Sequence, residues 1–307
     1  MEESIKKTIV ALTDHANEVI KGCYKNTDKI FSLTDNTRNS PDIANLAEAF
    51  GMMVVKVEAR EYQLEKTIEE LKEKKGTIEN LLLLRSQLSS IFISTVLLIT
   101  FYIFILGFLE TPSIKNLPNI DSIHIYVYRI VEVLALAIVI TIITKMHLPI
   151  RDFGINLNGW KRSIIESVLI SMAVIILLAL LKIFLNNSHP GIFKETQIFN
   201  FGYFGITYIT YIIVAPIQEF IARGVMQGSL SKLFSGKNSG LLAILVTSFL
   251  FGALHMCHSI SLSVVALLTS WLWGWMYNRQ KNLLGISISH FLIGNATDLM
   301  GYWTFFS

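Results

Sequence analysis

The chain is poor in cysteine and in charge, and each shortage excludes a class of protein. Its two cysteines, Cys23 and Cys257, are expected in different compartments, so no disulfide framework is predicted. Charged residues make up 16% of the 307 positions and hydrophobic residues 52%. Soluble domains average roughly 25% charged residues. The composition therefore indicates a membrane protein with a soluble extension rather than a soluble globular enzyme.

Two further patterns are absent, a secretory signal peptide and a nucleic-acid-binding surface. Residues 1–7 are charged, and the apolar run at 9–12 is too short for the hydrophobic part of a signal peptide. The net charge is only +3, without the concentrated basic patch that binds nucleic acid. We therefore expect neither a cleaved leader nor a nucleic-acid partner.

After residue 88 the chain contains a succession of long apolar runs. A membrane-spanning helix needs about 17–25 apolar residues to cross roughly 30 Å of hydrocarbon. The sequence therefore predicts an all-α fold, in which residues 89–307 form a polytopic membrane helical bundle of about seven spans within the lipid bilayer. The runs lie near 89–109, 125–146, 163–185, 201–217, 240–257, 260–277 and 283–304.

Lysine and arginine are unevenly distributed between the loops that connect these runs. They gather in the second loop, after the fourth run and in the sixth loop, whereas the alternate loops carry few. Because basic loops stay on the cytoplasmic side, we expect a multi-pass protein of the cell (inner or plasma) membrane with a cytosolic N-terminus and an external C-terminus. The basic residues that carry this argument are Lys145, Arg151, Lys161, Arg162, Arg223, Lys232, Lys237, Arg279 and Lys281.

Residues 1–88 have the pattern of a soluble, cytosolic coiled-coil stalk. After a break at residues 36–42, apolar residues recur at alternating spacings of three and four, which is the seam of a coiled coil. The segment 42–53 also resembles the second helix of a HAMP signalling linker and the signalling helix that follows one. We therefore expect a homodimer through this stalk, which either relays a signal or serves only as a tether. The seam residues are Ile43, Leu46, Phe50, Met53, Val57, Leu64, Ile68, Leu71, Ile78 and Leu82.

Ionisable and amide side chains interrupt three of the later apolar runs. Glu219 and Arg223 lie four residues apart, so they can face each other on one helix. Such pairing partly offsets the cost of a charge in the bilayer, roughly 2.5–3.5 kcal/mol each. His255 follows on a second run, and His290 with Asn295 on a third. Polar groups on three separate membrane segments indicate a site rather than packing.

The depth of Glu219 in the membrane depends on how the fourth run folds. Either Pro216 kinks a span that ends near Glu219, or residues 201–234 form one long helix with Glu219 near its middle. Only a common depth would let Glu219 meet the two histidines. Both alternatives agree with the sequence.

A hydrolase in the membrane needs three functions from such residues. One group must take a proton from water, a second must orient that water, and donors must stabilise the oxyanion. Glutamate with histidine suits the first two functions, and histidine with asparagine suits the third. No metal and no cofactor is expected, although His255 and His258 beside Cys257 leave a metal site as an alternative.

These residues resemble the three motifs of the CAAX prenyl protease type II and bacteriocin-processing (CPBP) family of intramembrane proteases. The motifs, Glu-Glu-x-x-x-Arg, Phe-x-x-x-His and His-x-x-x-Asn, correspond to residues 218–223, to residues 251–255, and to His290 with Asn295. The segment 148–160 also looks like the one that often opens this domain. The resemblance covers roughly residues 125–304. It implies an endopeptidase that cleaves peptide or membrane-protein substrates near the membrane surface.

The resemblance implies catalytic roles for four residues and supporting roles for three. One catalytic pair would activate water, and the other would hold the oxyanion. The residues are Glu219 and His255 for the water, His290 and Asn295 for the oxyanion, and Gln218, Arg223 and Phe251 in support.

The chain departs from these motifs at two positions. Gln218 stands where the family has its first glutamate, and an amide cannot act as a general base. Gly294 stands where the family has its asparagine, which comes one residue later as Asn295. Either Glu219, rotated about 100° around the helix, takes over as base, or the protein is a catalytically silent relative that binds or signals.

Other interpretations of the same residues compete with a catalytic site. Glu219 and Arg223 would form a purely structural ion pair, and each histidine would only bond a neighbouring helix. Asp298, about two turns beyond His290, is a further intramembrane acid that could pair with a histidine. A small transporter is disfavoured, because no internal repeat is visible.

Overall fold

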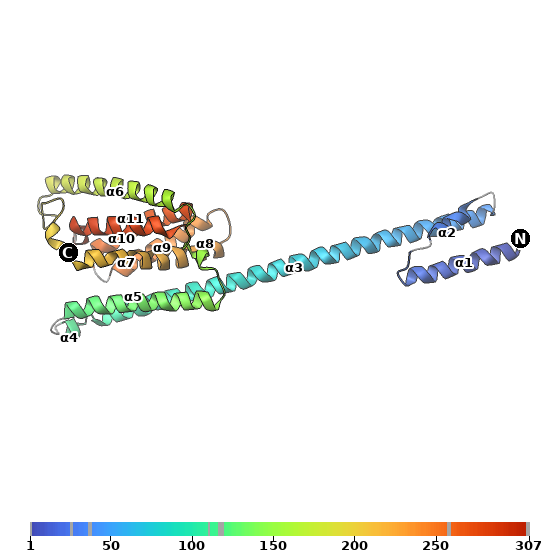
Figure 1. Ribbon diagram of the computed structural model, residues 1–307, viewed down its shortest axis with the longest axis horizontal. Helices are drawn as coiled ribbons and strands as arrows, with labels where there is room; N and C mark the ends of the chain where they lie inside the picture. Colours follow the sequence, from blue (N-terminus) through green and yellow to red (C-terminus); the bar gives the residue numbers. More distant parts are fainter. Residues whose placement is uncertain are drawn as a thin grey trace. The chain divides into compact units, whose positions relative to one another are not determined.

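The computed structural model describes residues 2–24, 27–35, 39–109, 111–115, 120–256 and 259–304. Within these ranges every regular element is a helix, and no strand is present (Figure 1). The predicted all-α fold is therefore confirmed. The chain divides into two compact units, Met1–Leu82 and Leu83–Ser307, and helix α3 (Pro41–Leu109) contributes residues to both.

The first unit is a small helical cluster with its own apolar core. Leu12 and Ile30 are buried together with Ala47 and Val54 of α3. Burial of a large apolar side chain contributes about 1.5–3 kcal/mol, so this core holds the short helices against the beginning of α3. The elements before α3 are α1 (Glu2–Ile20), α2 (Thr27–Phe31) and η1 (Ser32–Thr34).

The face of α3 that packs within this unit differs from the coiled-coil seam expected from the sequence. Ala44, Ala47 and Val54 are buried, whereas Leu46 and Met53 are 54% and 49% exposed. Of the longer seam residues, Phe50 packs partly against this core, whereas Leu46 and Met53 point away from it. Self-association through the seam stays a prediction. Further exposed seam residues are Leu64, Ile68, Leu71, Ile78 and Leu82.

The second unit contains the rest of α3 and the remaining helices. Each apolar run predicted from the sequence coincides largely with one of them. In chain order they are α4 (Pro112–Lys115), α5 (Ile120–Lys145), η2 (Ile150–Phe153), α6 (Trp160–Ser188), η3 (Phe201–Tyr203), α7 (Ile206–Glu219), η4 (Phe220–Gln227), α8 (Gly228–Leu233), α9 (Ser239–His255), α10 (Ile260–Gln280), α11 (Leu283–Leu299) and η5 (Tyr302–Thr304).

Several of these helices can cross a membrane. Five in the described chain are long and apolar enough by length and composition, while α9 and α11 have only 17 residues each. The chain is therefore a membrane protein. The count of about seven spans stays a prediction, because helices of this length cross only where the bilayer is thin or locally thinned. The five are Pro41–Leu109, Tyr126–Lys145, Trp160–Ser188, Ile206–Leu233 and Ile260–Gln280.

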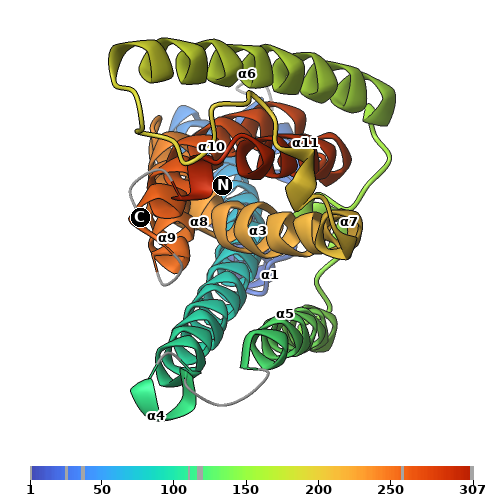
Figure 2. The same ribbon diagram turned by 90° about the vertical axis from the view of Figure 1, so that its left-hand side faces the viewer.

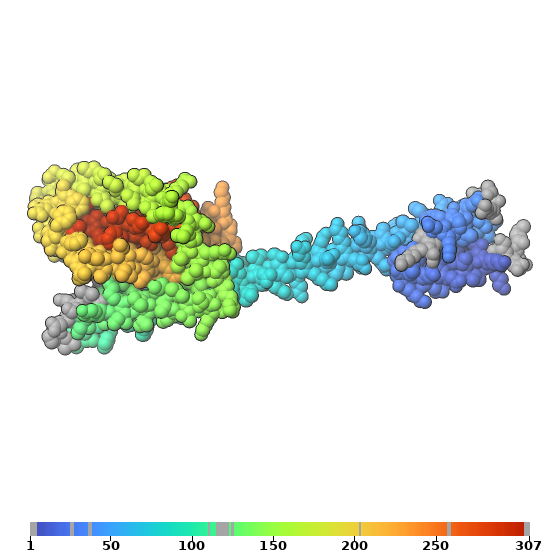
Figure 3. All heavy atoms as spheres, viewed as in Figure 1, coloured from blue at the N-terminus to red at the C-terminus, as the bar shows by residue number. Residues whose placement is uncertain are grey.

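Helix α11 lies between two neighbours in the second unit. It packs against α6 and α7, while α10 packs along α9. Figures 1 and 2 both show α11 between α6 and α7. The space-filling view in Figure 3 shows part of α11 (red) at the surface between them. This arrangement places the polar residues of α11 next to those of the α7 segment.

The segment that carries Glu219 and Arg223 is one continuous helix. Elements α7, η4 and α8 run together from Ile206 to Leu233, so of the two alternatives the structure shows the long helix with Glu219 near its middle, slightly shorter than residues 201–234. Pro216 lies inside α7, where it lacks the backbone N–H that would bond the preceding turn. The next turns, η4, are a π-helix, in which the N–H of Gly228 donates to the carbonyl of Arg223, five residues back. The sequence analysis did not foresee this π-helix.

Candidate active site in the membrane segment

Glu219 and Arg223 form a buried ion pair on the long helix. Neither side chain has exposed surface, and Arg223 Nε donates to Glu219 Oε2 over 3.2 Å. The same guanidinium donates from Nη2 to the Ser270 hydroxyl at 2.5 Å and from Nη1 to Gln227 Oε1 at 3.3 Å. Buried charges are costly unless they are paired and hydrogen-bonded, and these contacts meet both conditions. The pair also ties the long helix to α10, which carries Ser270.

His290 of α11 joins this network through the other oxygen of Glu219. His290 Nδ1 lies 2.8 Å from Glu219 Oε1, and His290 is 2% exposed. A carboxylate can only accept a hydrogen bond, so Nδ1 carries the proton. His290 Nε2 lies 2.8 Å from the hydroxyl of Tyr211, which donates to it when the ring is neutral. The orientation of His290 is therefore fixed at both ring nitrogens.

Aromatic side chains also hold His290 in place. Its ring stacks on Trp273 at a centroid distance of 4.0 Å, and Phe251 meets it at a steep angle at 5.7 Å. Trp273 is held in turn by a hydrogen bond from Nε1 to the hydroxyl of Ser289, 3.1 Å away. Side chains locked by such packing are the usual support of a precise functional geometry.

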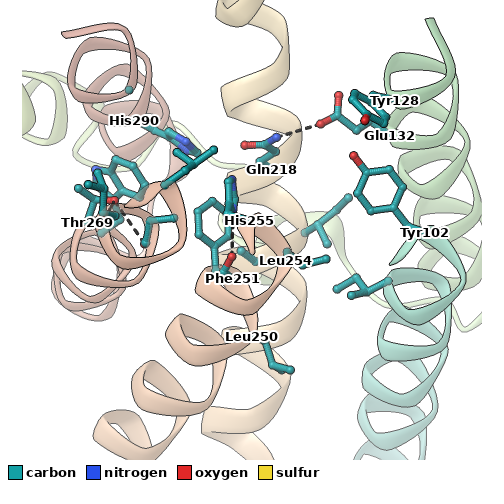
Figure 4. A pocket seen from close by; sticks show the side chains of 18 of the residues that line it. Tyr102, Tyr128, Glu132, Gln218, Leu250, Phe251, Leu254, His255, Thr269 and His290 are labelled. Carbon is teal, nitrogen blue, oxygen red and sulfur yellow. Dashed lines mark hydrogen bonds between the residues drawn. The ribbon is translucent and has the colours of Figure 1, made fainter. Parts of the chain in front are cut away.

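A cavity of about 510 Å³ lies beside this network. Its walls come from α3, α5, the α7 to η4 segment, α9, α10 and α11. Figure 4 shows polar side chains on several of these walls. Pockets for small ligands occupy roughly 300–1,000 Å³, so the cavity can hold a segment of a substrate. The polar residues that line it include Tyr102, Arg129, Glu132, Tyr211, Gln218, His255, Thr269 and His290.

Gln218 lines the cavity, although its neighbour Glu219 does not. Successive residues of a helix point about 100° apart, so only one of the two can face this wall. Gln218 Nε2 donates to Glu132 Oε1 on α5 over 2.9 Å, as the dashed line in Figure 4 shows. Glu132 Oε2 accepts from Arg129 Nη1 at 2.7 Å. The carboxylate in the cavity therefore belongs to Glu132, which the sequence analysis did not single out.

His255 lines the cavity at the end of α9. Its Nδ1 lies 2.7 Å from the backbone oxygen of Phe251, one turn earlier, and the two rings are 4.7 Å apart. Because the carbonyl oxygen accepts, Nδ1 carries a proton. The ring of His255 is thus held at the cavity wall by its own helix.

Asn295 is not among the described residues that line the cavity. Its Nδ2 lies 3.5 Å from the backbone oxygen of Tyr208. Gly294 lines the cavity instead, and a Cβ added there would come within 2.8 Å of the Tyr211 ring. The ring of Tyr211 thus fills the space next to Gly294, and its hydroxyl bonds His290.

Two further expectations concerned Asp298 and a metal. Asp298 accepts a hydrogen bond from the Tyr208 hydroxyl. Cys257 and His258, which belong to the alternative metal site, lie outside the described residues. Among the residues that the structure describes, no group of three or more histidines, cysteines and acids could hold a metal ion.

Apart from Asn295, the structure brings the predicted site residues together in two sets that share His290. One set is the buried network with Glu219 and Arg223, and the other is the cavity wall. The sequence analysis did not single out Glu132 or Tyr211, because neither residue is part of one of the three motifs. Glu132 could have been noticed because it is an acidic residue within an apolar run, and acids in membrane helices rarely lack a role. The predicted residues on the cavity wall are Gln218, Phe251, His255 and His290.

Fold and site together define a helical membrane protein with a buried acid–histidine network beside a cavity. Residues 200–295 match the family model described as type II CAAX prenyl endopeptidase Rce1-like. For this segment the match supports the predicted resemblance to the CAAX prenyl protease and bacteriocin-processing (CPBP) family. No curated protein and no solved structure matches the chain. The resemblance of the first unit to a signalling coiled coil stays a prediction.

Proposed function

We propose that the protein is an intramembrane endopeptidase that hydrolyses a peptide or the tail of a membrane protein in this cavity. The observation that carries the proposal is a cavity of about 510 Å³ between apolar helices, lined by His255 and His290 from two different helices. Two imidazoles on one cavity supply the proton transfers that amide hydrolysis needs. The family match over residues 200–295 supports peptide hydrolysis as the class of reaction.

The two histidines suit different parts of the reaction. His255 lines the cavity with Nδ1 bonded to the Phe251 carbonyl, and its imidazole suits the transfer of a proton during hydrolysis. Tyr211 suits the oxyanion, because its hydroxyl can donate to developing negative charge once His290 Nε2–H donates to the hydroxyl oxygen. Glu219 accepts from His290 Nδ1 and so holds the ring in this orientation.

Glu219 and Asn295, to which the sequence assigned catalysis, receive other roles in this proposal. Glu219 has no exposed surface, and its two oxygens are bonded to His290 and Arg223. It therefore positions His290 rather than activating water. Asn295 bonds the backbone away from the cavity lining, so Tyr211 replaces it as the donor to the oxyanion.

The lining of the cavity supports an apolar substrate. Most of its side chains are aliphatic or aromatic, which is the usual composition of a site that binds an apolar group. The match to a CAAX prenyl endopeptidase makes lipid-modified and leader-type peptides the first classes to test. Apolar lining residues include Leu250, Phe251, Leu262, Trp273 and Ile293.

Cleavage by the purified full chain in lipid vesicles tests the proposal. A panel of prenylated and leader-type peptides is incubated with the protein, and the products are identified by mass spectrometry. We expect the wild type to cleave at a defined bond, and His255→Ala and His290→Ala to lose at least about 100-fold in kcat/KM. The control is His189→Ala, an exposed histidine at the end of α6, which should keep wild-type activity. Cleavage that is unchanged in both cavity-histidine variants contradicts the proposal.

A second candidate, a catalytically silent binding module, is favoured by one observation. Gln218 faces the cavity where the family has an acid, and its amide has no basic lone pair. Under this alternative the wild type binds the peptides but releases no product. Gln218→Glu would then create activity that the wild type lacks. Peptide binding and product formation, measured on the same samples, separate the two candidates.

The proposed assembly is a homodimer in the cell membrane with a cytosolic N-terminus. Exposed apolar residues along α3, such as Leu46, Met53 and Leu64, support self-association of the first unit. The uneven distribution of basic residues between the loops supports the orientation.

A further inference from the structure

Glu132 is the only carboxylate among the described residues that line the cavity. It lies on α5, outside the residues 200–295 that match the protease family. Its side chain is 15% exposed. An acid within a membrane helix is costly and usually marks a function. Its place on the same cavity as His255 and His290 points to chemistry.

Two hydrogen bonds orient the Glu132 carboxylate without saturating it. Oε1 accepts from Gln218 Nε2 at 2.9 Å, and Oε2 accepts from Arg129 Nη1 at 2.7 Å. A carboxylate offers about four lone-pair sites, so each oxygen can still accept from a further donor. The group is therefore held in one orientation and retains the capacity to take a proton from water.

Gln218 contributes a second acceptor beside this carboxylate. Its Oε1 is buried and has no hydrogen-bond partner within the described chain, while its Nε2 bonds Glu132. A buried acceptor without a partner costs roughly 1–3 kcal/mol, so this position of Gln218 is kept at a cost to stability. The cost indicates that its bond from Nε2 to Glu132 matters.

We infer that Glu132 is the general base of this site, and that Gln218 positions it. The inference rests on the proposed peptidase function. Glu219 is unsuited to the role, because its oxygens bond His290 and Arg223 and it lies behind the cavity wall. Gln218 stands where the family has a glutamate. In this chain a carboxylate from α5, that of Glu132, takes the place of that missing acid.

The reaction step is a hydrolysis that consumes one water molecule. Glu132 takes a proton from the water as the water oxygen bonds to the carbonyl carbon, and the electron pair of the C=O double bond moves to the carbonyl oxygen. When the C=O bond re-forms, the C–N bond breaks. The proton held by Glu132 passes to the leaving nitrogen, with His255 as the relay. The products are one carboxylic acid and one amine.

The first test replaces Glu132 by glutamine in the full chain in lipid vesicles. Glu132→Gln keeps the size and can still accept a hydrogen bond from Gln218, but it removes the base. We expect kcat/KM for peptide cleavage to fall by about 10²–10⁴-fold. The matched control is Glu166→Gln. Glu166 pairs with Arg279 at 2.8 Å and does not line the cavity, so this variant should keep wild-type activity.

The second test moves the carboxylate across the same hydrogen bond. A variant with both Glu132→Gln and Gln218→Glu keeps an amide–carboxylate pair between α5 and α7, with the two groups exchanged. We expect it to recover at least about tenfold of the activity that Glu132→Gln loses, because a base is again present on the cavity wall. A purely structural role in pairing with Arg129 would give no recovery, since Arg129 lacks its partner in both variants.

A third variant guards against loss of the fold. Glu132→Asp keeps the negative charge beside Arg129 but withdraws the carboxylate by one methylene group. A displacement of this size costs about 100-fold in activity when the geometry of the base matters. Size-exclusion chromatography and thermal unfolding show whether each variant is folded. A folded Glu132→Asp with wild-type activity overturns the inference.

The outcomes separate this inference from the proposed function. Wild-type cleavage that persists in folded Glu132→Gln overturns the role of Glu132 and leaves the peptidase standing. A wild type that cleaves nothing, while Gln218→Glu cleaves the same peptides, also overturns it, because Glu132 then does not serve as base. If neither protein cleaves, the proposed function itself fails.

Discussion

His290 Nδ1 and Glu219 Oε1 lie 2.8 Å apart, although the two residues are 71 positions apart in the chain. Both side chains are almost fully buried, and Glu219 shares its other oxygen with Arg223. The acid thereby orients one imidazole at the edge of the cavity and balances the charge of a buried guanidinium. The site depends on a contact that no single helix contains.

Replacing Glu219 by glutamine tests this contact. Glu219→Gln keeps the shape of the side chain but leaves Arg223 buried without a charge partner. We expect a loss of about 3–5 kcal/mol in stability, seen as a lower Tm in detergent, together with a loss of cleavage as His290 becomes disoriented. The partly exposed pair of Glu166 and Arg279 is the comparison, because Glu166→Gln should cost only about 0–1 kcal/mol. Equal Tm values for the two variants would contradict the buried pair.

Tyr211→Phe tests the donor on the other side of His290. The change removes only the hydroxyl that bonds Nε2 and keeps the ring beside Gly294. Loss of one oxyanion donor typically lowers kcat by about 10²–10³-fold, and we expect a fall in this range with little change in Tm. Tyr302→Phe is the control, because its hydroxyl bonds the Leu178 backbone outside the cavity lining. A similar fall in both variants would remove the assigned role.

Gly294→Ala tests the fit between α11 and Tyr211. A Cβ at position 294 would approach the Tyr211 ring to 2.8 Å, so the ring has to move and its hydroxyl leaves His290. We expect a loss of activity close to that of Tyr211→Phe, together with a destabilisation of about 1–3 kcal/mol from overpacking. Gly107→Ala in α3 has no atom within 4 Å of the added Cβ and should keep both properties. Kinetics and thermal unfolding of the two variants check this, and unchanged Gly294→Ala kinetics would contradict it.

The seam of α3 tests the expected dimer. A fragment of residues 1–82 should sediment as a dimer, because Leu46 and Met53 are about half exposed in the single chain. Leu46→Asp with Met53→Asp should convert it to a monomer. Val55→Asp is the control, since Val55 is also exposed but lies about 180° around the helix from Leu46. A wild-type fragment that sediments as a monomer would leave the first unit as a tether.

Reporter fusions test the orientation in the membrane. The distribution of basic residues predicts that a fusion after Lys237 lies in the cytosol and one after Ser307 outside. An alkaline phosphatase reporter should therefore be active only after Ser307, and a fluorescent protein that folds in the cytosol only after Lys237. If both fusions lie on the same side, the chain crosses the membrane an even number of times between Lys237 and Ser307. That result would contradict the predicted three spans in this part of the chain.

The helices and the buried ion pair could be predicted because each leaves a local pattern in the sequence. Apolar runs of membrane length mark the helices, and the four-residue spacing of Glu219 and Arg223 places both on one helix face. The meeting of Glu219 with His290 was harder to place. It depended on whether the chain bends at Pro216, and the continuous helix from Ile206 to Leu233 answers that question.

The polar partners of the cavity could not be predicted in the same way. Glu132 and Gln218 are 86 positions apart, and no spacing rule relates residues on separate helices. Which residue of the Gln218–Glu219 pair faces the cavity depends on the rotation of the long helix against α5 and α11. On α3, likewise, the core of the first unit takes in Ala47 and Val54 with part of Phe50, whereas hydropathy alone favours the whole predicted seam.

The wide separation of the site residues along the chain has a consequence for biosynthesis. Helices enter the bilayer in order from the ribosome, and Glu132, Gln218 and His290 belong to early, middle and final helices of the unit. A nascent chain that has inserted only as far as α9 carries Glu132, Gln218 and His255 but not His290 of α11. The proposed site is therefore complete only once α11 has docked beside α7. If the protein is a peptidase, as proposed, a partly synthesised chain would be inactive towards neighbouring membrane proteins.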